Sequence, residues 1–270
     1  NVALAFNGQG MNMLLNMFFG PAVNAARGVA YQIQNIINQF VSNFQVALNP
    51  QIVKTYANKE MQRMYTLMYA SSKYGFLLLF FLSLPVMVCA KYILTLWLGI
   101  VPVHTVNFVR IILITCMVSA MSNSSVVAAG ATGKIRNYTL IVATLALLPL
   151  PVSYILLKFI DIPELVFATL LFFECLSLSA RLLLMRKMIG LSIIQYLKHV
   201  IFPVLGVVLS SAWIPIVVYN LLDVNLWTTA LICCISFLCV GVSIYIIGLN
   251  PNEKLMARSI VKNKIINKWK

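Results

Sequence analysis

The run YGFLLLFFLSLPVMVCA, residues Tyr74–Ala90, contains no charged side chain, and LIVATLALLPLPVSYILL at Leu140–Leu157 has the same character. Each run approaches the ~20 apolar residues that an α-helix needs to cross the hydrocarbon core of a bilayer. The chain of 270 residues is 61% hydrophobic and 10% charged. Soluble domains carry roughly 25% charged residues. The sequence therefore predicts an all-α fold, a polytopic bundle of transmembrane helices.

Apolar runs separated by breakers predict about eight spans. Their ranges are 2–19, 22–48, 73–90, 104–129, 138–157, 163–185, 200–220 and 227–249. The segment 92–99 is too short to span again, and its tryptophan, Trp97, suits the interface between membrane and water. Residues 50–73 are expected to form a basic loop.

The charges between these spans alternate from loop to loop. Loops 50–73, 130–137 and 181–199 and the C-terminal tail are rich in lysine and arginine, whereas the intervening loops are poor in them. Because positive charge favours the cytoplasmic side, we expect a multi-pass membrane protein with a cytoplasmic C-terminus. The net charge of +14 then reflects topology and attraction to the lipid bilayer. We expect no nucleic acid as a partner.

No chemistry of an enzyme or a metal site can be recognised in the sequence. The six cysteines lie within apolar runs without a CxxC pair, and His104 and His199 are isolated. No nucleophile–base–acid set is present, so we expect neither catalysis nor a cofactor. The chain begins at Asn1 and enters an apolar run at once, with no signal-peptide pattern before it. We therefore expect it to be a fragment of a longer protein.

The second span carries a stripe of polar side chains. Successive members are three or four residues apart, which places them on one face of a helix. They are Asn24, Arg27, Tyr31, Gln34, Asn38, Ser42, Gln45 and Asn49. The first span repeats the pattern with Gln9, Asn12 and Asn16. Because unpaired polar groups are costly in hydrocarbon, we expect these faces to line a hydrated lumen, the alternative being amide links between packed helices.

Three charged side chains inside predicted spans suggest a function. Arg27 and Arg110 have no acid nearby in the sequence, and guanidinium pairs well with phosphate or carboxylate, so they suggest an anionic substrate. Arg27 could instead extend to the interface. Glu174 is either a site of ion coupling or the partner of an arginine such as Arg181 on the same helix.

Several stretches, taken together, resemble a known family. They are NGQGMNMLLNMFFGPAVNAARGVAYQI, FQVALNPQIVKTYA, SSKYGFLLLFFLSLP, ILTLWLGIVP and AGATGKIRNY, in this order. Over residues 1–190 the chain resembles the C-terminal half of bacterial polysaccharide flippases, of the O-antigen and capsule type. These belong to the multidrug/oligosaccharidyl-lipid/polysaccharide exporter superfamily.

The resemblance implies fourteen helices in the whole protein, two six-helix lobes followed by a final pair. Residues 1–190 would be the second lobe, 191–249 the final pair and 250–270 a basic cytoplasmic tail. The implied function is to flip undecaprenyl-diphosphate-linked oligosaccharide across the inner membrane for cell-surface polysaccharide and lipopolysaccharide biosynthesis. Polysaccharide polymerase machinery is a candidate partner.

The substrate-binding hypothesis divides the polar residues between two tasks. Arg27, with Arg110, would attract the diphosphate. Uncharged amides would form exchangeable hydrogen bonds with sugar hydroxyls, and they are those of Asn12, Asn16, Asn24, Gln34, Asn38 and Gln45.

Two other function classes stay open. A cation-coupled multidrug extruder of the same superfamily would require acids in the cavity, and the second span has none. A membrane-embedded polysaccharide polymerase or glycosyltransferase would require a large extramembrane loop with catalytic residues, and the longest predicted loop is the short basic segment 50–73.

Overall fold

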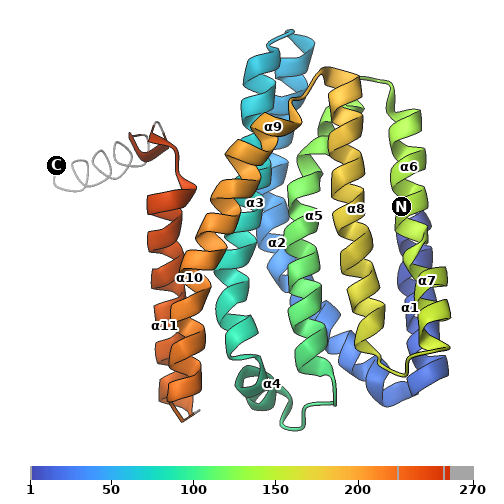
Figure 1. The fold of residues 1–270 in the computed structure, drawn as a ribbon, viewed down its shortest axis with the longest axis vertical. Coiled ribbons are helices and arrows are strands. Elements are labelled where there is room, and N and C mark those ends of the chain that lie inside the picture. The colour runs from blue at the N-terminus through green and yellow to red at the C-terminus, as the bar shows by residue number, and fades with distance from the viewer. Residues whose placement is uncertain (1, 224, 252, 256–270) are drawn as a thin grey trace.

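The computed structural model describes residues 2–223, 225–251 and 253–255, and all regular structure in this part of the chain is helical (Figure 1). The helices are α1 (Val2–Phe19), α2 (Pro21–Ala57), α3 (Met61–Val88), α4 (Ala90–Leu98), α5 (Thr105–Ala131), α6 (Ile135–Leu147), α7 (Pro149–Leu157), α8 (Glu164–Ile189), α9 (Ile193–Tyr196), α10 (Phe202–Leu221) and α11 (Leu226–Ser243). Two short π-helical segments, η1 (Leu197–Ile201) and η2 (Ile244–Gly248), continue α9 and α11.

Six helical segments of the described chain are long and apolar enough to cross a membrane. They are Met61–Val88, Thr105–Ala131, Ile135–Leu157, Glu164–Ile189, Ile193–Leu221 and Leu226–Gly248. The predicted polytopic helical membrane protein is thus confirmed, but the count of eight spans is supported only for six. Helix α1 forms over the expected residues and α2 includes its expected range, yet their amides make both too polar to qualify by composition.

The expected loop at 50–73 is wrong. Helix α2 continues through Pro50 to Ala57, and α3 begins at Met61, so only residues 58–60 separate the two helices. Lys59 makes this turn with a φ of 60°. The end of an apolar run shows where the chain can leave the membrane. It does not show where the helix ends, because the helix continues as long as its backbone hydrogen bonds do. Ile52 of α2 and Met64 of α3 are both fully buried and belong to the same hydrophobic core.

Helix α5 lies at the centre of the bundle. It packs against α2, α3 and α8, while α1, α6 and α7 close the side beyond α8 and α2. Helices α10 and α11 pack against each other and against α3, at the opposite side of the molecule (Figure 1). The short α4 fits the predicted interfacial segment, and it ends at Gly99, whose φ of 70° suits a residue without a Cβ. The division into a lobe and a final pair of helices stays a prediction.

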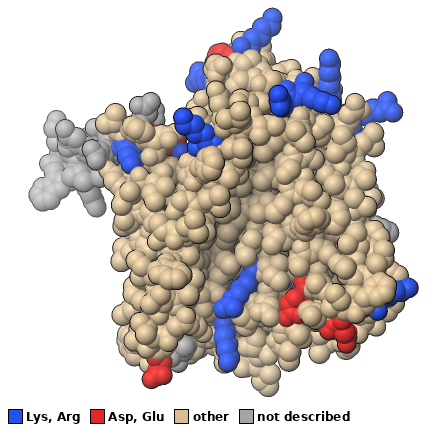
Figure 2. Space-filling model, in the orientation of Figure 1, with Lys and Arg blue, Asp and Glu red and all other residues tan. Residues whose placement is uncertain are grey.

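Lysine and arginine gather at one end of the molecule, around the α2–α3, α5–α6 and α8–α9 connections (Figures 1 and 2). The cations of these connections are Lys54, Lys59, Arg63, Lys134, Arg136, Arg186, Lys187 and Lys198. We call this the cationic end. The opposite end carries the acids Asp161, Glu164 and Asp223. Most of the predicted basic tail, residues 256–270, lies outside the described residues.

An ion pair fastens the segment after η2 to α3. Lys73 Nζ lies 2.8 Å from Glu253 Oε2 and 3.0 Å from Oε1, and the Lys73 side chain is only 3% exposed. Burial raises the pKa of the Glu253 carboxyl, but hydrogen bonds from Lys73, the Asn250 backbone N–H and Tyr74 outweigh it. The pKa therefore lies below its ordinary value. The carboxylate is the form that this contact stabilises.

Replacing Glu253 should therefore destabilise the protein in a pH-dependent way. A depressed pKa contributes stability above the ordinary carboxyl value of about 4.3, and the contribution is lost as the pH falls through the lower folded value. We expect Glu253→Gln to cost about 1–2 kcal/mol at pH 7, because it leaves Lys73 buried and unpaired. The difference from the unmodified chain should shrink below about pH 4. Thermal unfolding in detergent across this pH range measures it.

Glu60→Gln is the matched control. Its carboxylate pairs with Arg63 at 3.3 Å, but the two side chains are 41% and 71% exposed. Such surface pairs contribute about 0–1 kcal/mol. Equal effects of the two substitutions at pH 7 would show that the Lys73–Glu253 contact does not fasten the segment.

Candidate functional site

The helices on one side of the bundle enclose a cavity of about 720 Å³. Residues of α1, α2, α5, α6 with the start of α7, and α8 line it. These elements come from sequence positions as far apart as Asn7 and Arg181, so only the folded bundle creates the cavity. A space of this size is within the range of pockets that hold small organic ligands.

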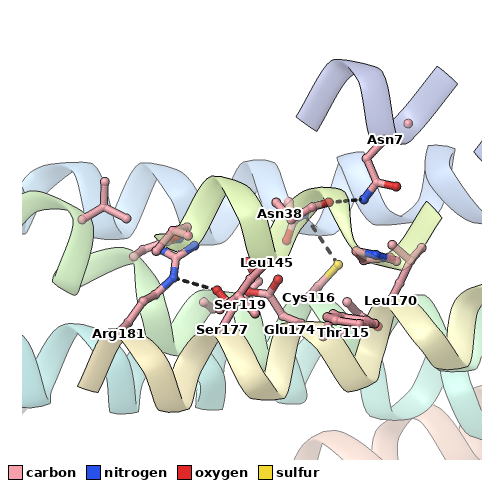
Figure 3. Close-up of a pocket in the computed structure, with 18 of the residues that line it drawn as sticks. Asn7, Asn38, Thr115, Cys116, Ser119, Leu145, Leu170, Glu174, Ser177 and Arg181 are labelled. Atoms are coloured by element: carbon pink, nitrogen blue, oxygen red, sulfur yellow. Dashed lines mark hydrogen bonds between the residues drawn. The ribbon is translucent and has the colours of Figure 1, made fainter. Parts of the chain in front are cut away.

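The α2 wall of the cavity carries part of the predicted polar stripe. Tyr31, Gln34, Asn38, Ser42 and Gln45 line the cavity, as their spacing of three or four residues requires. Gln34 Oε1 is buried and has no hydrogen-bond partner. Asn38 Nδ2 donates to Cys116 Sγ at 3.7 Å (Figure 3). Because sulfur is a weak acceptor, both amides retain capacity to bind a ligand.

Gln45 differs from its neighbours because its amide is already occupied. Its Nε2 donates to Ala120 O at 2.8 Å and to Ser71 O at 3.4 Å, and its Oε1 accepts a hydrogen bond from Asn123 at 2.7 Å. The residue is 3% exposed. Gln45 thus links α2 to α3 and α5, which is the packing alternative considered for the polar stripe.

Helix α8 contributes the charged groups of the cavity. Glu174, Ser177 and Arg181 line it together, opposite Ser119 of α5 and Tyr138 of α6 (Figure 3). Arg181 Nε donates to Ser177 Oγ at 3.1 Å, and Nη1 donates to the Tyr138 hydroxyl at 3.3 Å. Glu174 Oε1 is buried without a hydrogen-bond partner.

Arg27 lies beside the cavity and not among the residues that line it. Its Nη2 donates to Gly8 O at 2.8 Å, and the guanidinium stacks over the Tyr31 ring, 4.5 Å from the ring centre. Its Nε is buried without a partner. Arg27 therefore joins α2 to α1 behind Tyr31, a residue that does face the cavity.

The remaining predicted binding residues lie elsewhere. Asn12 and Asn24 are half-buried and Asn16 is exposed, and none of the three lines the cavity. Arg110 is exposed, and its Nε donates to Met87 O at 3.0 Å near the end of α3. The structure therefore does not bring Arg27 and Arg110 together around the cavity.

Arg181, the arginine that does line the cavity, falls where the predicted span 163–185 overlaps the predicted basic loop 181–199. Helix α8 runs on to Ile189, so the guanidinium stays within the bundle. A signal was present: Glu174, Ser177 and Arg181 follow one another at steps of three and four. The predicted span 163–185 already includes Arg181, and the helical period places it on the same face as Glu174.

No protein-family model, no curated protein and no solved structure matches this chain. The cavity and the sequence pattern are therefore the features that bear on the function.

Proposed function

We propose that the chain is the cavity-forming part of a membrane transporter that flips undecaprenyl-diphosphate-linked oligosaccharide across the bacterial inner membrane. The observation that carries this proposal is a cavity with amide, hydroxyl and charged side chains in its wall, inside a bundle that contains six apolar helices long enough to span a membrane. Unpaired amides are costly in such surroundings unless water or a polar ligand occupies the space beside them. A glycan provides that ligand, and cell-surface polysaccharide biosynthesis provides the biological setting.

The chemistry of the lining suits sugar hydroxyls. Gln34 and Asn38 offer both donors and acceptors without a net charge, so they can bind a hydroxyl and release it again. Tyr31 and Tyr138 add aromatic surface, and each carries a guanidinium beside it, that of Arg27 and that of Arg181. These arginines provide positive charge at two places near the cavity for the diphosphate. In this proposal the protein binds and moves its substrate and performs no catalysis.

The proposed orientation follows from the charges. The cationic end would face the cytoplasm, where positively charged connections are favoured. Arg181, on the cytoplasmic side of Glu174 along α8, would then meet the diphosphate of a substrate that enters from that side.

Binding of the substrate is the direct test. The purified chain in detergent should bind a fluorescent undecaprenyl-diphosphate-linked oligosaccharide more tightly than the same lipid diphosphate without sugar. Equal binding of the two lipids would overturn the assignment of the cavity to the glycan.

The double substitution Gln34→Leu and Asn38→Leu should weaken glycan binding about tenfold or more, because two hydrogen-bonding amides are lost from the cavity wall. The matched control is Gln32→Leu with Gln39→Leu on the same helix, since both of these side chains are exposed. The control should bind like the unmodified chain. Equal weakening in both double variants would contradict a specific role for the cavity face.

One observation favours a second candidate, a cation-coupled extruder of the same superfamily. Such a protein requires an acid in its cavity, and Glu174 lies there. It would bind lipophilic cations in preference to lipid-linked sugar, so the binding assay described above separates the two functions.

A further inference from the structure

Glu174 is the one acidic residue among the described cavity-lining residues, and Arg181 is the one basic residue. Both side chains point into the cavity from the same helix (Figure 3). They lie seven residues apart, which corresponds to about 10 Å along the helix axis. The three ion pairs found between described residues do not include these two.

The structure keeps the two charges apart. Arg181 is directed to Ser177 and the Tyr138 hydroxyl, and its guanidinium lies 5.9 Å from the centre of the Tyr138 ring. Glu174 therefore forms no ion pair, and its Oε1 has no hydrogen bond, although Ser119 hydrogen-bonds to the carboxylate and the charge of Arg181 acts on it from beyond ion-pair distance. A carboxylate in a bundle interior is costly unless a cation or donors compensate it. The cavity thus presents one carboxylate oxygen without a donor and, about two helical turns away, a guanidinium that is held by hydrogen bonds.

We propose that Glu174 binds an ammonium group of the ligand, while Arg181 binds an anionic group of the same ligand. An ammonium has three donors and a full positive charge, so it can satisfy the unpaired Oε1 and neutralise the carboxylate. This inference rests on the proposed function and makes it more specific. The transported glycan carries a sugar with a free amine, not only hydroxyls and N-acetyl groups.

An N-acetylated sugar would fit the subsite poorly. Its amide N–H can donate one hydrogen bond but brings no charge, so the carboxylate would stay uncompensated in the occupied cavity. Neutral amides such as Gln34 would bind either form of the sugar. The discrimination between the two forms should therefore depend on Glu174.

The test compares two lipid-linked disaccharides that differ only in whether the amine is free or acetylated. The purified chain should bind the free amine about tenfold more tightly or better, as expected for a charge-assisted hydrogen bond. Glu174→Gln should abolish this preference, and Glu174→Asp, which keeps the carboxylate, should retain part of it. Glu60→Gln removes an exposed carboxylate and should leave the preference intact. Thermal unfolding confirms that each variant is folded.

The outcomes distinguish this inference from the proposed function. Equal, tight binding of both disaccharides by the unmodified chain would overturn the ammonium subsite and leave the flippase function standing. Binding of neither would overturn the proposed function. Dodecylamine, a lipophilic amine without sugar or phosphate, separates the sources of the ammonium. If it binds in a Glu174-dependent way and the amino sugar does not, the glycan assignment is wrong.

Discussion

Gly75→Ala should destabilise the bundle by about 2–3 kcal/mol, although alanine is the better helix former. A Cβ at Gly75 would lie 2.3 Å from Gln45 Nε2 and 3.2 Å from its Cδ, far inside contact distance. The Gln45 side chain must then move. Its movement would break the hydrogen bonds to Ala120 O and from Asn123, in an interior where water cannot replace them. Thermal unfolding of the detergent-solubilised chain measures the loss.

Two comparisons isolate the cause. Gly28→Ala, on α2, introduces a Cβ with nothing within 4 Å and should leave stability unchanged or raise it by up to about 1 kcal/mol. The double variant Gly75→Ala with Gln45→Ala removes both the collision and the amide. It should be little less stable than Gln45→Ala alone, because the two positions act through one contact. Additive losses would show that Gly75 matters for another reason.

The same contact shows what the sequence could and could not predict about the site. The helical period correctly placed Gln34, Asn38 and Gln45 on one face of α2. It could not show that Gln45 packs against Gly75, whereas Gln34 faces the cavity with an unpaired Oε1. Periodicity determines which residues share a face, but the neighbouring helix decides whether an amide there is a structural link or a free ligand.

The membrane character was predicted from the apolar runs, because their length relates directly to bilayer thickness. The ends of the helices were not predictable in this way. Helix α3 begins twelve residues before its expected start at 73, and α8 extends four residues past its expected end at 185. Arg181 lies within both the expected and the observed helix, and only the packing of α8 against α5 and α6 shows that it faces the cavity. Arg110 lies within a predicted span but does not face the cavity, because it donates to Met87 O near the end of α3. A position inside a span therefore does not imply a position in the cavity wall.

Filling the cavity should have the largest effect on function. Ala143, a half-buried residue of α6, lines the cavity, so Ala143→Trp would place an indole ring in a space of about 720 Å³. We expect glycan binding to weaken by about tenfold or more, because the ring would displace the sugar from Gln34 and Asn38. Equilibrium binding of the fluorescent lipid-linked oligosaccharide measures the effect.

The control for bulk and hydrophobicity is Ala25→Trp, at an exposed position of α2 outside the cavity lining. It should bind as the unmodified chain does. Because overpacking can itself cost about 1–3 kcal/mol, Ser119→Trp on the facing wall of α5 provides a second route to the same filled cavity. If either cavity variant keeps its thermal unfolding transition and still binds the glycan normally, the substrate does not occupy this space. The glycan would then have to bind the exposed amides on the other face of α2, which are those of Gln32, Asn35, Gln39 and Asn43.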